Sequence, residues 1–252
     1  MSKKKRKANA KKAPGSGGAG GGRWSPGRVD ERLAALARGN VRETAAGGMT
    51  PAKALEVAGA AHFLAGYLIG QVEAINPLPQ AVACREGCAW CCYNQVEVTA
   101  PEALLLGHFV ATNFSPAEKE SLLARIMRTR ALTAGADKVA RARRRSELPC
   151  PLLMARRCAA YGVRPLTCRA MHALDEAQCE HEIHSGELGG SSYYAHRQDI
   201  TVSVAAGLRA GCRDLGWQEG PLDLESALYD FLTKENPVAR WLKGEKVFGG
   251  QR

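Results

Sequence analysis

Residues 84–92 read CREGCAWCC and place four thiols, Cys84, Cys88, Cys91 and Cys92, within nine positions of the chain. Cysteines this close together are typical of metal ligands, because a thiol loses its proton on binding a metal and a tight loop can direct several sulfurs at one point. The stretch therefore predicts a metal centre, and we expect the fold to be built around it.

A second group of thiols follows further along the chain. Cys150, Cys158 and Cys168 fall within nineteen residues, and Cys179 comes shortly after them. Prolines and Gly162 interrupt this stretch, which favours a loop over a regular helix. Seven or eight thiolates suffice for two four-coordinate sites, or for one iron–sulfur cluster with four ligands and further thiols around it. The number of thiols leaves both arrangements open.

Several side chains near the thiols have expected roles. Neighbouring residues in an extended backbone point to opposite faces, so we expect one of Cys91 and Cys92 to face the metal and the other to face a second metal or the core. Arg164 and Arg169 are expected to offset the negative charge of several thiolates, with ordinary salt bridges to nearby acids as the alternative. Tyr161 is expected to pack under the loop.

The segments on either side of the first cysteine block predict helices. Thr50 is a suitable N-cap with Pro51 at the first helical position, and the apolar pattern continues to the Asn-Pro stop at residues 76–77. Residues 99–102, TAPE, form a capping box, which begins a second helix. The cysteine loop is thus expected to be held by a helix at each end.

Two apolar stretches contain residues that could be mistaken for ligands. The longest apolar run, Val57–Val72, is interrupted by His62 and is too short to span a bilayer, so we predict a buried helix. A single histidine among apolar residues is more typical of a hydrogen-bonded core residue than of a metal ligand. Cys212 lies in another helical pattern and is predicted to be a small buried apolar residue.

The rest of the chain is also helical in pattern. A helix is predicted over residues 29–39, and a capping box at 115–118 begins a long helix to about residue 145. We expect its basic C-terminal end to be solvated, because positively charged side chains near a helix C-terminus interact favourably with the helix dipole. Residues 96–98 are too few to predict a strand. Three further helices are expected, over residues 193–215, 222–232 and 237–242.

These patterns together predict the fold class. The expected fold is an all-α single domain over residues 29–252, with an irregular cysteine-rich metal-binding centre whose motifs lie within residues 80–180. A chain of this length and apolar content can bury a sizeable core.

The basic charge of the chain lies at its start. The formal net charge is +10, but residues 1–29 hold nine of the 35 Lys and Arg and no acid, which leaves 26 basic and 25 acidic side chains for the rest. Residues 1–28, rich in Lys and Gly, cannot bury a core and are predicted to be a disordered tail. Such a tail attracts polyanions weakly and without specificity, and we prefer this interpretation to a dedicated nucleic-acid arm.

The cysteine content also bears on the compartment. The charged start has no apolar segment behind it, so we expect no secretory signal peptide. In a long helical protein, nine cysteines favour metal or redox chemistry over disulfides. We therefore expect a reducing cytoplasm.

The two cysteine blocks have a recognisable order and spacing. The first is Cys-x3-Cys-x2-Cys-Cys at 84–92, and the second contains Arg-Pro-x-x-Cys-Arg at 164–169. In these elements the chain resembles the YkgJ-like cysteine-cluster family, also called the CxxCxxCC zinc- or iron-chelating domain. The resemblance implies metal chelation by the thiols of these blocks, which are Cys84, Cys88, Cys91, Cys92, Cys150, Cys158 and Cys168. Cys179, which follows shortly after them, is the eighth candidate ligand.

Two enzymatic hypotheses stand beside metal chelation. A remote branch associated with flagellin lysine methylation is similar around the cysteines, which makes a cluster-dependent protein-lysine methyltransferase an alternative. Residues 84–91 also fit the three-cysteine signature of radical S-adenosylmethionine enzymes. Those enzymes need strand–helix units to build a partial barrel, whereas the sequence after Cys92 predicts helices. The signature also leaves Cys92 and the second block without a role.

The choice of metal rests on the ligand type. All-thiolate ligation without a histidine partner fits zinc and iron–sulfur alike, and the close spacing of residues 84–91 leads us to favour an iron–sulfur cluster.

No catalytic base, nucleophile or phosphate-binding loop is identifiable, and the histidines near Cys179 are expected to be surface or capping residues. These are His172, His181 and His184. A basic-tailed, nucleic-acid-associated zinc protein is the third class of function to test.

Overall fold

The computed structural model describes residues 22–23, 27–187 and 190–249. The predicted disordered tail falls almost entirely outside them. Its last residues, however, contact the fold: β1 (Gly22–Arg23) pairs antiparallel with β5 (Ser192–Tyr193), and the Arg28 N–H donates to Asp199 Oδ1 at 2.7 Å. The chain is therefore attached to the fold several residues earlier than the sequence predicts.

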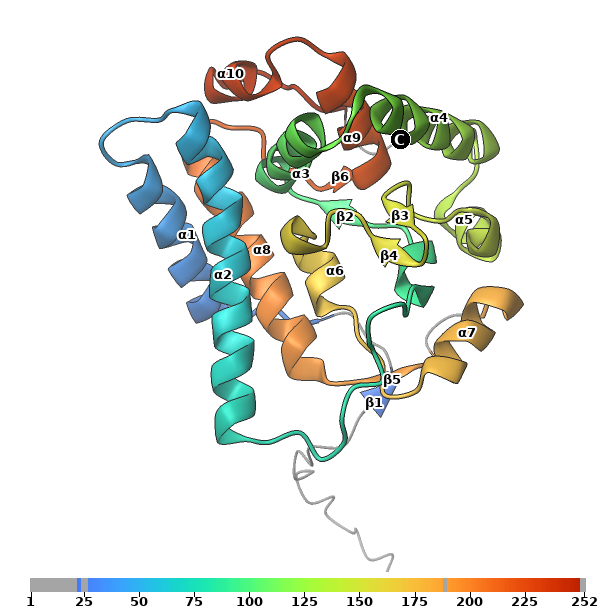
Figure 1. The fold of residues 1–252 in the computed structure, drawn as a ribbon. Helices are drawn as coiled ribbons and strands as arrows, with labels where there is room; N and C mark the ends of the chain where they lie inside the picture. The colour runs from blue at the N-terminus through green and yellow to red at the C-terminus, as the bar shows by residue number, and fades with distance from the viewer. Residues whose placement is uncertain (1–21, 24–26, 188–189, 250–252) are drawn as a thin grey trace, which may run out of the picture.

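Three long helices form one side of the molecule (Figure 1). They are α1 (Glu31–Ala45), α2 (Pro51–Ile75) and α8 (Ala195–Asp214). The Asp30 side chain caps α1, which begins close to the predicted residue 29 but runs beyond residue 39. Gly207 and Gly211 of α8 face α1, and a Cβ at Gly207 would lie 2.1 Å from the carbonyl oxygen of Ala34. These two glycines allow the helices to pack at close range.

Helix α2 has the predicted ends, with the Thr50 side chain accepting the Lys53 N–H at its start. Its predicted burial is correct for one face only. His62 and five apolar residues of that face are buried, whereas Phe63, Tyr67 and Ile75 are 75%, 54% and 77% exposed. By length and composition alone α2 also satisfies the requirements of a membrane span. Its inner face, however, belongs to the core that it shares with α3 and α8.

A second group of helices lies across the top of the view in Figure 1. It consists of α3 (Ala100–Asn113), α4 (Pro116–Leu132), α9 (Leu224–Thr233) and α10 (Pro237–Leu242). Both predicted capping boxes are present at the starts of α3 and α4. The largest fully buried side chains of this group include Leu104, Leu122 and Trp241. The capping motifs therefore fix where these helices begin.

Helix α4 ends earlier than predicted. It stops at Leu132, and Gly135 with a φ of +73° turns the chain into the short α5 (Lys138–Arg143) and the 3₁₀ turn η2 (Arg145–Glu147). The predicted solvation of the basic end is wrong for Arg145, which is 6% exposed and donates to the carbonyls of Glu182 and Glu187. Arg141 also turns inward, toward Asp223 and Glu225.

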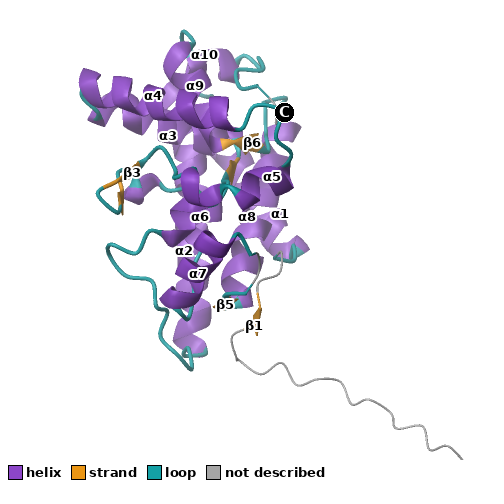
Figure 2. Ribbon diagram, turned by 90° about the vertical axis from the view of Figure 1, so that its right-hand side faces the viewer, coloured by secondary structure: helices purple, strands orange, loops and turns teal. Residues whose placement is uncertain are grey.

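The described strands have two residues each and serve to fasten loops (Figure 2). β2 (Glu97–Val98) pairs with β6 (Leu222–Asp223), which links the exit of the first cysteine block to the start of α9. β3 (Leu153–Met154) and β4 (Arg157–Cys158) form a hairpin in the second block. The protein is mainly helical, which confirms the predicted fold class.

Candidate metal centre

The first cysteine block is a compact loop that ends in a 3₁₀ turn, η1 (Trp90–Tyr93). Gly87 adopts a φ of +87°, a conformation that favours glycine, and the Cys88 N–H donates to the Arg85 carbonyl at 3.0 Å. At the start of the loop, the Ala173 N–H donates to Cys84 Sγ at 3.3 Å. The loop is thus fixed to a segment about ninety residues later in the chain.

Cys91 and Cys92 do not lie in extended backbone, contrary to the sequence prediction. Both belong to η1, and their side chains hydrogen-bond to each other. Successive residues of a 3₁₀ helix project about 120° apart rather than to opposite faces. Both residues therefore line the same cavity.

The second block is brought to the first by the backbone. The Cys150 N–H donates to the Cys92 carbonyl at 2.7 Å, and the chain then enters the β3–β4 hairpin, which ends in Cys158. A 3₁₀ turn, η3 (Tyr161–Val163), leads into α6 (Leu166–Ala170), which bears Cys168. The predicted loop is therefore a hairpin followed by two short helical segments.

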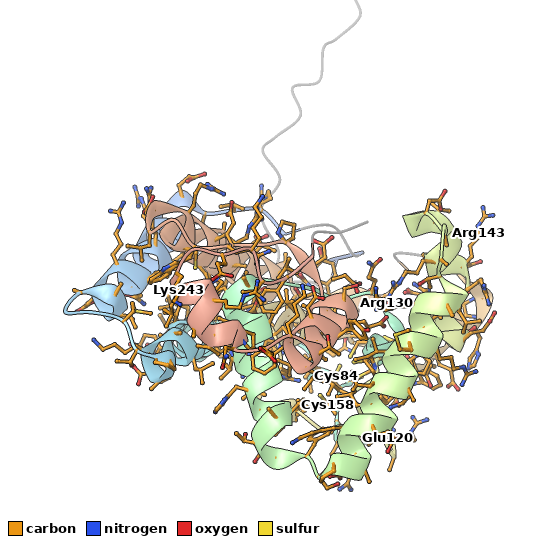
Figure 3. All side chains as sticks on the ribbon, turned by 90° about the horizontal axis from the view of Figure 1, so that it is seen from above. Cys84, Glu120, Arg130, Arg143, Cys158 and Lys243 are labelled. Atoms are coloured by element: carbon orange, nitrogen blue, oxygen red, sulfur yellow. The ribbon has the colours of Figure 1, made fainter. Side chains whose placement is uncertain are left out.

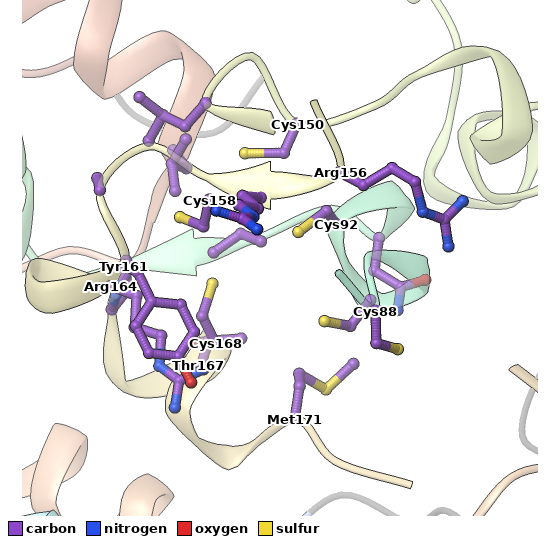
Figure 4. A pocket seen from close by; sticks show the side chains of 18 of the residues that line it. Cys88, Cys92, Cys150, Arg156, Cys158, Tyr161, Arg164, Thr167, Cys168 and Met171 are labelled. Atoms are coloured by element: carbon purple, nitrogen blue, oxygen red, sulfur yellow. The ribbon is translucent and has the colours of Figure 1, made fainter. Parts of the chain in front are cut away.

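Six of the eight candidate thiols line one cavity of about 500 Å³ between the two blocks. They are Cys88, Cys91, Cys92, Cys150, Cys158 and Cys168. Figure 4 shows that the labelled thiols surround a common space, with Met171 below it. Seen from above, Cys84 and Cys158 appear between α3 and α4 (Figure 3). The helix layer therefore lies over the cysteine region.

The other two candidate thiols, Cys84 and Cys179, do not line this cavity. Cys179 lies on α7 (Glu176–Ser185), a helix that the sequence interpretation did not predict. Its sulfur is 3.5 Å from Ser191 Oγ, and it interacts electrostatically with Cys84 and Cys88. An Asp175 N-cap and a left-handed Gly186 at the C-terminus were the available sequence signals for this helix.

The electrostatic environment keeps the free thiols protonated. Burial raises the pKa of Cys150 and Cys168 far above the ordinary value of a thiol. The hydrogen bond with Cys92, and then desolvation, raise the pKa of Cys91 in the same direction. A metal that binds these sulfurs must displace their protons, and its charge supplies the attraction that stabilises the thiolates.

Arg164 is one of four arginines that line the cavity, and its charge acts on thiols of both blocks. Its guanidinium lies 4.2 Å from the centre of the Tyr161 ring, and its charge acts on Cys84, Cys91, Cys158 and Cys168. No acid pairs with Arg164 among the described residues. It is therefore placed to offset thiolate charge, as expected.

Two neighbours of Arg164 follow their predicted roles only in part or not at all. Arg169 donates from Nε to the Arg164 carbonyl at 2.9 Å and from Nη2 to the Gly162 carbonyl at 2.8 Å, and its charge also acts on Cys168, so it supports the loop as well as facing a thiol. Tyr161 is 63% exposed beside the Arg164 guanidinium and does not pack under the loop.

A buried carboxylate positions the helix that bears Cys168. Glu102 Oε1 accepts the Leu166 N–H at 2.7 Å and lies 3.2 Å from His62 Nε2, while Oε2 accepts both Thr99 donors at 2.8 Å. Burial alone would raise the pKa of Glu102, but His62 and the backbone donors outweigh it and hold that pKa below its usual range. His62 is thus the hydrogen-bonded core residue that the sequence predicts, and it does not act as a ligand.

The remaining histidines have structural contacts. His172 accepts the Tyr194 N–H on Nε2 at 2.7 Å, and its Nδ1 lies 2.8 Å from the Ala170 carbonyl. His184 lies edge-on to Trp90, and His181 is exposed beside Glu187. Cys212 is fully buried in α8, as predicted.

The chemistry of the donor set fits a metal that prefers sulfur. The side chains are not in a ligated arrangement, because no group of three or more Cys, His, Asp or Glu within the described ranges is positioned to hold an ion. The backbone nevertheless brings six thiols to one cavity, and rotation about χ1 lets a cysteine redirect its sulfur without moving the main chain. The positions therefore suit soft thiolate ligation, which selects zinc and iron–sulfur clusters.

Comparison with known proteins agrees with this donor set. Residues 83–185 match the model of the CxxCxxCC family, described as "Putative zinc- or iron-chelating domain". The match spans both cysteine blocks and confirms the family resemblance. No curated protein and no solved structure matches the chain.

Proposed function

We propose that this chain, a metal-binding cysteine-cluster protein whose CxxCxxCC domain covers residues 83–185, uses the cavity between its two cysteine blocks to hold an iron–sulfur cluster in preference to zinc. One observation carries the proposal: six thiols from segments far apart in the sequence line a single cavity. Disulfides do not occupy them, because all nine cysteines are free.

The size and chemistry of the cavity support this preference. A volume of about 500 Å³ is far more than one metal ion requires, and the cavity is lined by six thiols, the Glu86 carboxylate and the Met171 thioether, without a histidine. Structural zinc sites are closed by four ligands around one ion, whereas cubane clusters occupy more space and are held by thiolates. When bound, such a group supplies electron transfer or structural stabilisation.

The protein's own residues have separate tasks in this proposal. The thiols bind the group, Arg164 offsets their negative charge, and Glu102 fixes the start of α6 so that Cys168 is held at the cavity wall. We place this chemistry in a reducing cytoplasm, where free thiols persist. We do not extend it to the radical-enzyme class, because the described strands are two-residue pairs and cannot form the required barrel.

The deciding experiment is metal and sulfide analysis of anaerobically purified protein, together with its visible spectrum. A brown protein with iron and acid-labile sulfide in matching amounts would support the cluster. A colourless protein with stoichiometric zinc would overturn the preference for iron but retain the thiolate centre. Protein that takes up neither metal under reducing conditions would refute the proposed function.

The ligand set is tested by substitution. Cys88→Ser and Cys168→Ser are each expected to lower the metal content and the free energy of unfolding, since metal-binding free energy is largely folding free energy in such sites. Cys212→Ser is the matched control, because Cys212 is buried in α8 away from the cavity. Full metal content in both test variants would exclude these ligands.

A further inference from the structure

The outer face of α2 carries no charge over residues 63–75. Glu73, the acid of this stretch, is paired with His196 and Arg197 of α8. Helix α1, which packs beside α2, exposes arginines and glutamates along its outer face, as is usual for a surface helix. The exposed residues of α2 over this stretch are all uncharged: Phe63, Gly66, Tyr67, Gly70, Gln71, Ala74 and Ile75.

This outer face is long, and its large side chains stand free. Residues 63–75 extend over about 18 Å of helix. The rings of Phe63 and Tyr67 stack with their centres 6.2 Å apart, and Ile75 is 77% exposed. Gly66 and Gly70 lie beside them, and a Cβ at either glycine would meet nothing within 4 Å. A contiguous apolar surface of this kind marks an interaction site.

The most basic segment of the chain is joined to the fold at one end of this face. Residues 1–21 hold seven Lys and Arg and no acid. They lead into β1, which pairs with β5, and β5 directly precedes the first turn of α8, where His196 and Arg197 bind Glu73 near the end of α2 (Figure 1). The ten residues from Lys12 to Gly22 span at most about 35 Å, which is enough to reach along the whole outer face.

We propose that the outer face of α2 and the basic segment 1–21 together bind the surface of an anionic lipid bilayer. The apolar side chains enter the boundary between headgroups and acyl chains, where Tyr67 is favoured, and the Lys and Arg lie against the negative headgroups. Helix α2 lies along the surface and does not cross it, because its inner face belongs to the protein core.

The charge of the chain favours lipid as the occupant of this face. The partner must present an apolar layer to α2 and dense negative charge to residues 1–21, and an anionic bilayer presents both over any distance that the segment can reach. Stable attachment to a bilayer normally takes two such signals, because one alone binds marginally. This inference does not depend on the bound metal.

Sedimentation with lipid vesicles tests the proposal on the full-length protein. Vesicles of phosphatidylglycerol and phosphatidylcholine in equal parts are compared with vesicles of phosphatidylcholine alone. We expect binding to the anionic vesicles and an affinity for the neutral ones that is lower by about tenfold or more, because the neutral surface does not attract the Lys and Arg.

Two charge-matched variants separate the outer face of α2 from the general potential of the protein. Phe63→Glu should lower the affinity for anionic vesicles by about tenfold, because an aromatic side chain no longer enters the boundary. Met127→Glu is the control, since Met127 is 48% exposed on α4 and the charge change is the same. Tyr67→Glu repeats the test should Phe63→Glu fail to fold. Deletion of residues 1–21 should also lower the affinity by at least about tenfold.

Three results would overturn the proposal. The first is no binding of the unsubstituted protein to the anionic vesicles. The second is binding that is lost on deletion of residues 1–21 but kept in Phe63→Glu and Tyr67→Glu, which would mean that the basic segment binds alone. The third is a lipid-free dimer, seen by sedimentation equilibrium, that Phe63→Glu dissociates and Met127→Glu does not, which would assign the face to a second copy of the chain.

Discussion

Arg164 illustrates what a single side chain contributes to the cysteine region. It is the cation that acts on thiols of both blocks, and no acid within the described ranges competes for it. Replacing it by Gln removes the charge that offsets the thiolates. Residues that support metal ligands from outside typically affect affinity by about 10–100-fold, and we expect a loss of zinc affinity in this range for Arg164→Gln, measured by competition with a chelator.

The control for this variant is Arg157→Gln, which removes a cation that lines the same cavity but is exposed and pairs with Glu86. A comparable loss of affinity in both variants would mean that the general positive potential matters and that Arg164 has no specific role.

Glu225 gives the stability a pH dependence. Burial raises its pKa to about 7 against the attraction of Arg141, whose Nη2 is 3.2 Å from Oε2. The pKa of a Glu side chain in the unfolded chain is about 4.3. Between these values the folded state binds the proton more tightly than the unfolded state, so this residue lowers the stability as pH rises to 7. The cost is absent below pH 4.3 and complete above pH 7.

We therefore expect Glu225→Gln to stabilise the protein at pH 8, by up to about 3 kcal/mol, and to have a smaller effect at pH 5. Urea unfolding at the two pH values measures the difference. Glu235→Gln is the control, since Glu235 is exposed and lies just beyond the end of α9, the helix that carries Glu225. An equal gain at both pH values would show that Glu225 ionisation does not limit stability.

At the residue scale, the sequence predicts the chemical role of a side chain better than the direction in which that side chain points. The thiol positions, buried His62 and buried Cys212 follow from residue type and pattern. The relative direction of the Cys91 and Cys92 side chains does not follow from residue type, because it depends on the 3₁₀ backbone of η1. The inward turn of Arg145 depends on a long-range partner, which no local pattern contains, whereas Tyr161 is exposed against the guanidinium of Arg164, three residues further along the chain.

At the scale of elements, two capping boxes with the same residue pattern are in different environments. Glu102 caps α3 from a fully buried position and also holds the start of α6, whereas Glu118 caps α4 at the surface. Gln is tolerated in an exposed capping box, so Glu118→Gln should change the stability little. In Glu102→Gln an amide NH₂ would face buried donors, which should cost about 3–5 kcal/mol.

Chemical unfolding of the two variants measures these costs. Glu102→Gln should in addition weaken metal binding, because the Leu166 N–H that it releases lies two residues before Cys168. Equal costs in the two variants would contradict the view that Glu102 joins α2, α3 and α6.

The packing of α1 against α8 depends on glycine. A Cβ at Gly207 would lie 2.1 Å from a backbone oxygen, whereas a Cβ at Gly66, on the exposed face of α2, meets nothing within 4 Å. Gly207→Ala should therefore destabilise the protein by about 1–3 kcal/mol, because the helices must move apart. Gly66→Ala should stabilise it by about 0.5–1 kcal/mol through helix propensity. Thermal unfolding of both variants checks the opposite signs, and a stabilised Gly207→Ala would contradict this packing.

Helix starts are predicted more accurately than helix ends. Thr50, Thr99 and Ser115 carry their capping signal in the side chain, so the starts of α2, α3 and α4 are found within one residue. The end of α4 is missed because the apolar periodicity fades gradually and Gly135 alone marks the break. Helix α7 is missed because it buries only Ile183 and so lacks an apolar stripe.

At the scale of the molecule, the candidate metal centre depends on segments that lie far apart in the sequence and meet only in the folded chain. The first block meets the second through the hydrogen bond from the Cys150 N–H to the Cys92 carbonyl, and α7 carries Cys179 outside the cavity that they share. The sequence therefore predicts a set of candidate thiols, through spacing and family resemblance, but not which of them line one cavity. That depends on contacts across the whole fold, which no spacing within one block encodes.

The basic tail can be separated from the fold at a definite residue. Gly22 and Arg23 pair with β5, so a truncation should remove residues 1–21 and keep that strand. This deletion removes seven Lys and Arg and no acid, which lowers the formal net charge from +10 to +3. We expect retention on heparin or nucleic acid at low salt to fall sharply, because counterion release at Lys and Arg supplies such binding. Metal content and melting temperature should stay unchanged, since the cysteine region and the core lie beyond residue 29.

A longer deletion of residues 1–28 is the informative comparison: it also removes the Arg28 N–H bond to Asp199 and should lower the melting temperature. Undiminished retention after the 1–21 deletion would place polyanion binding on the folded surface and would revive the nucleic-acid-associated class of function.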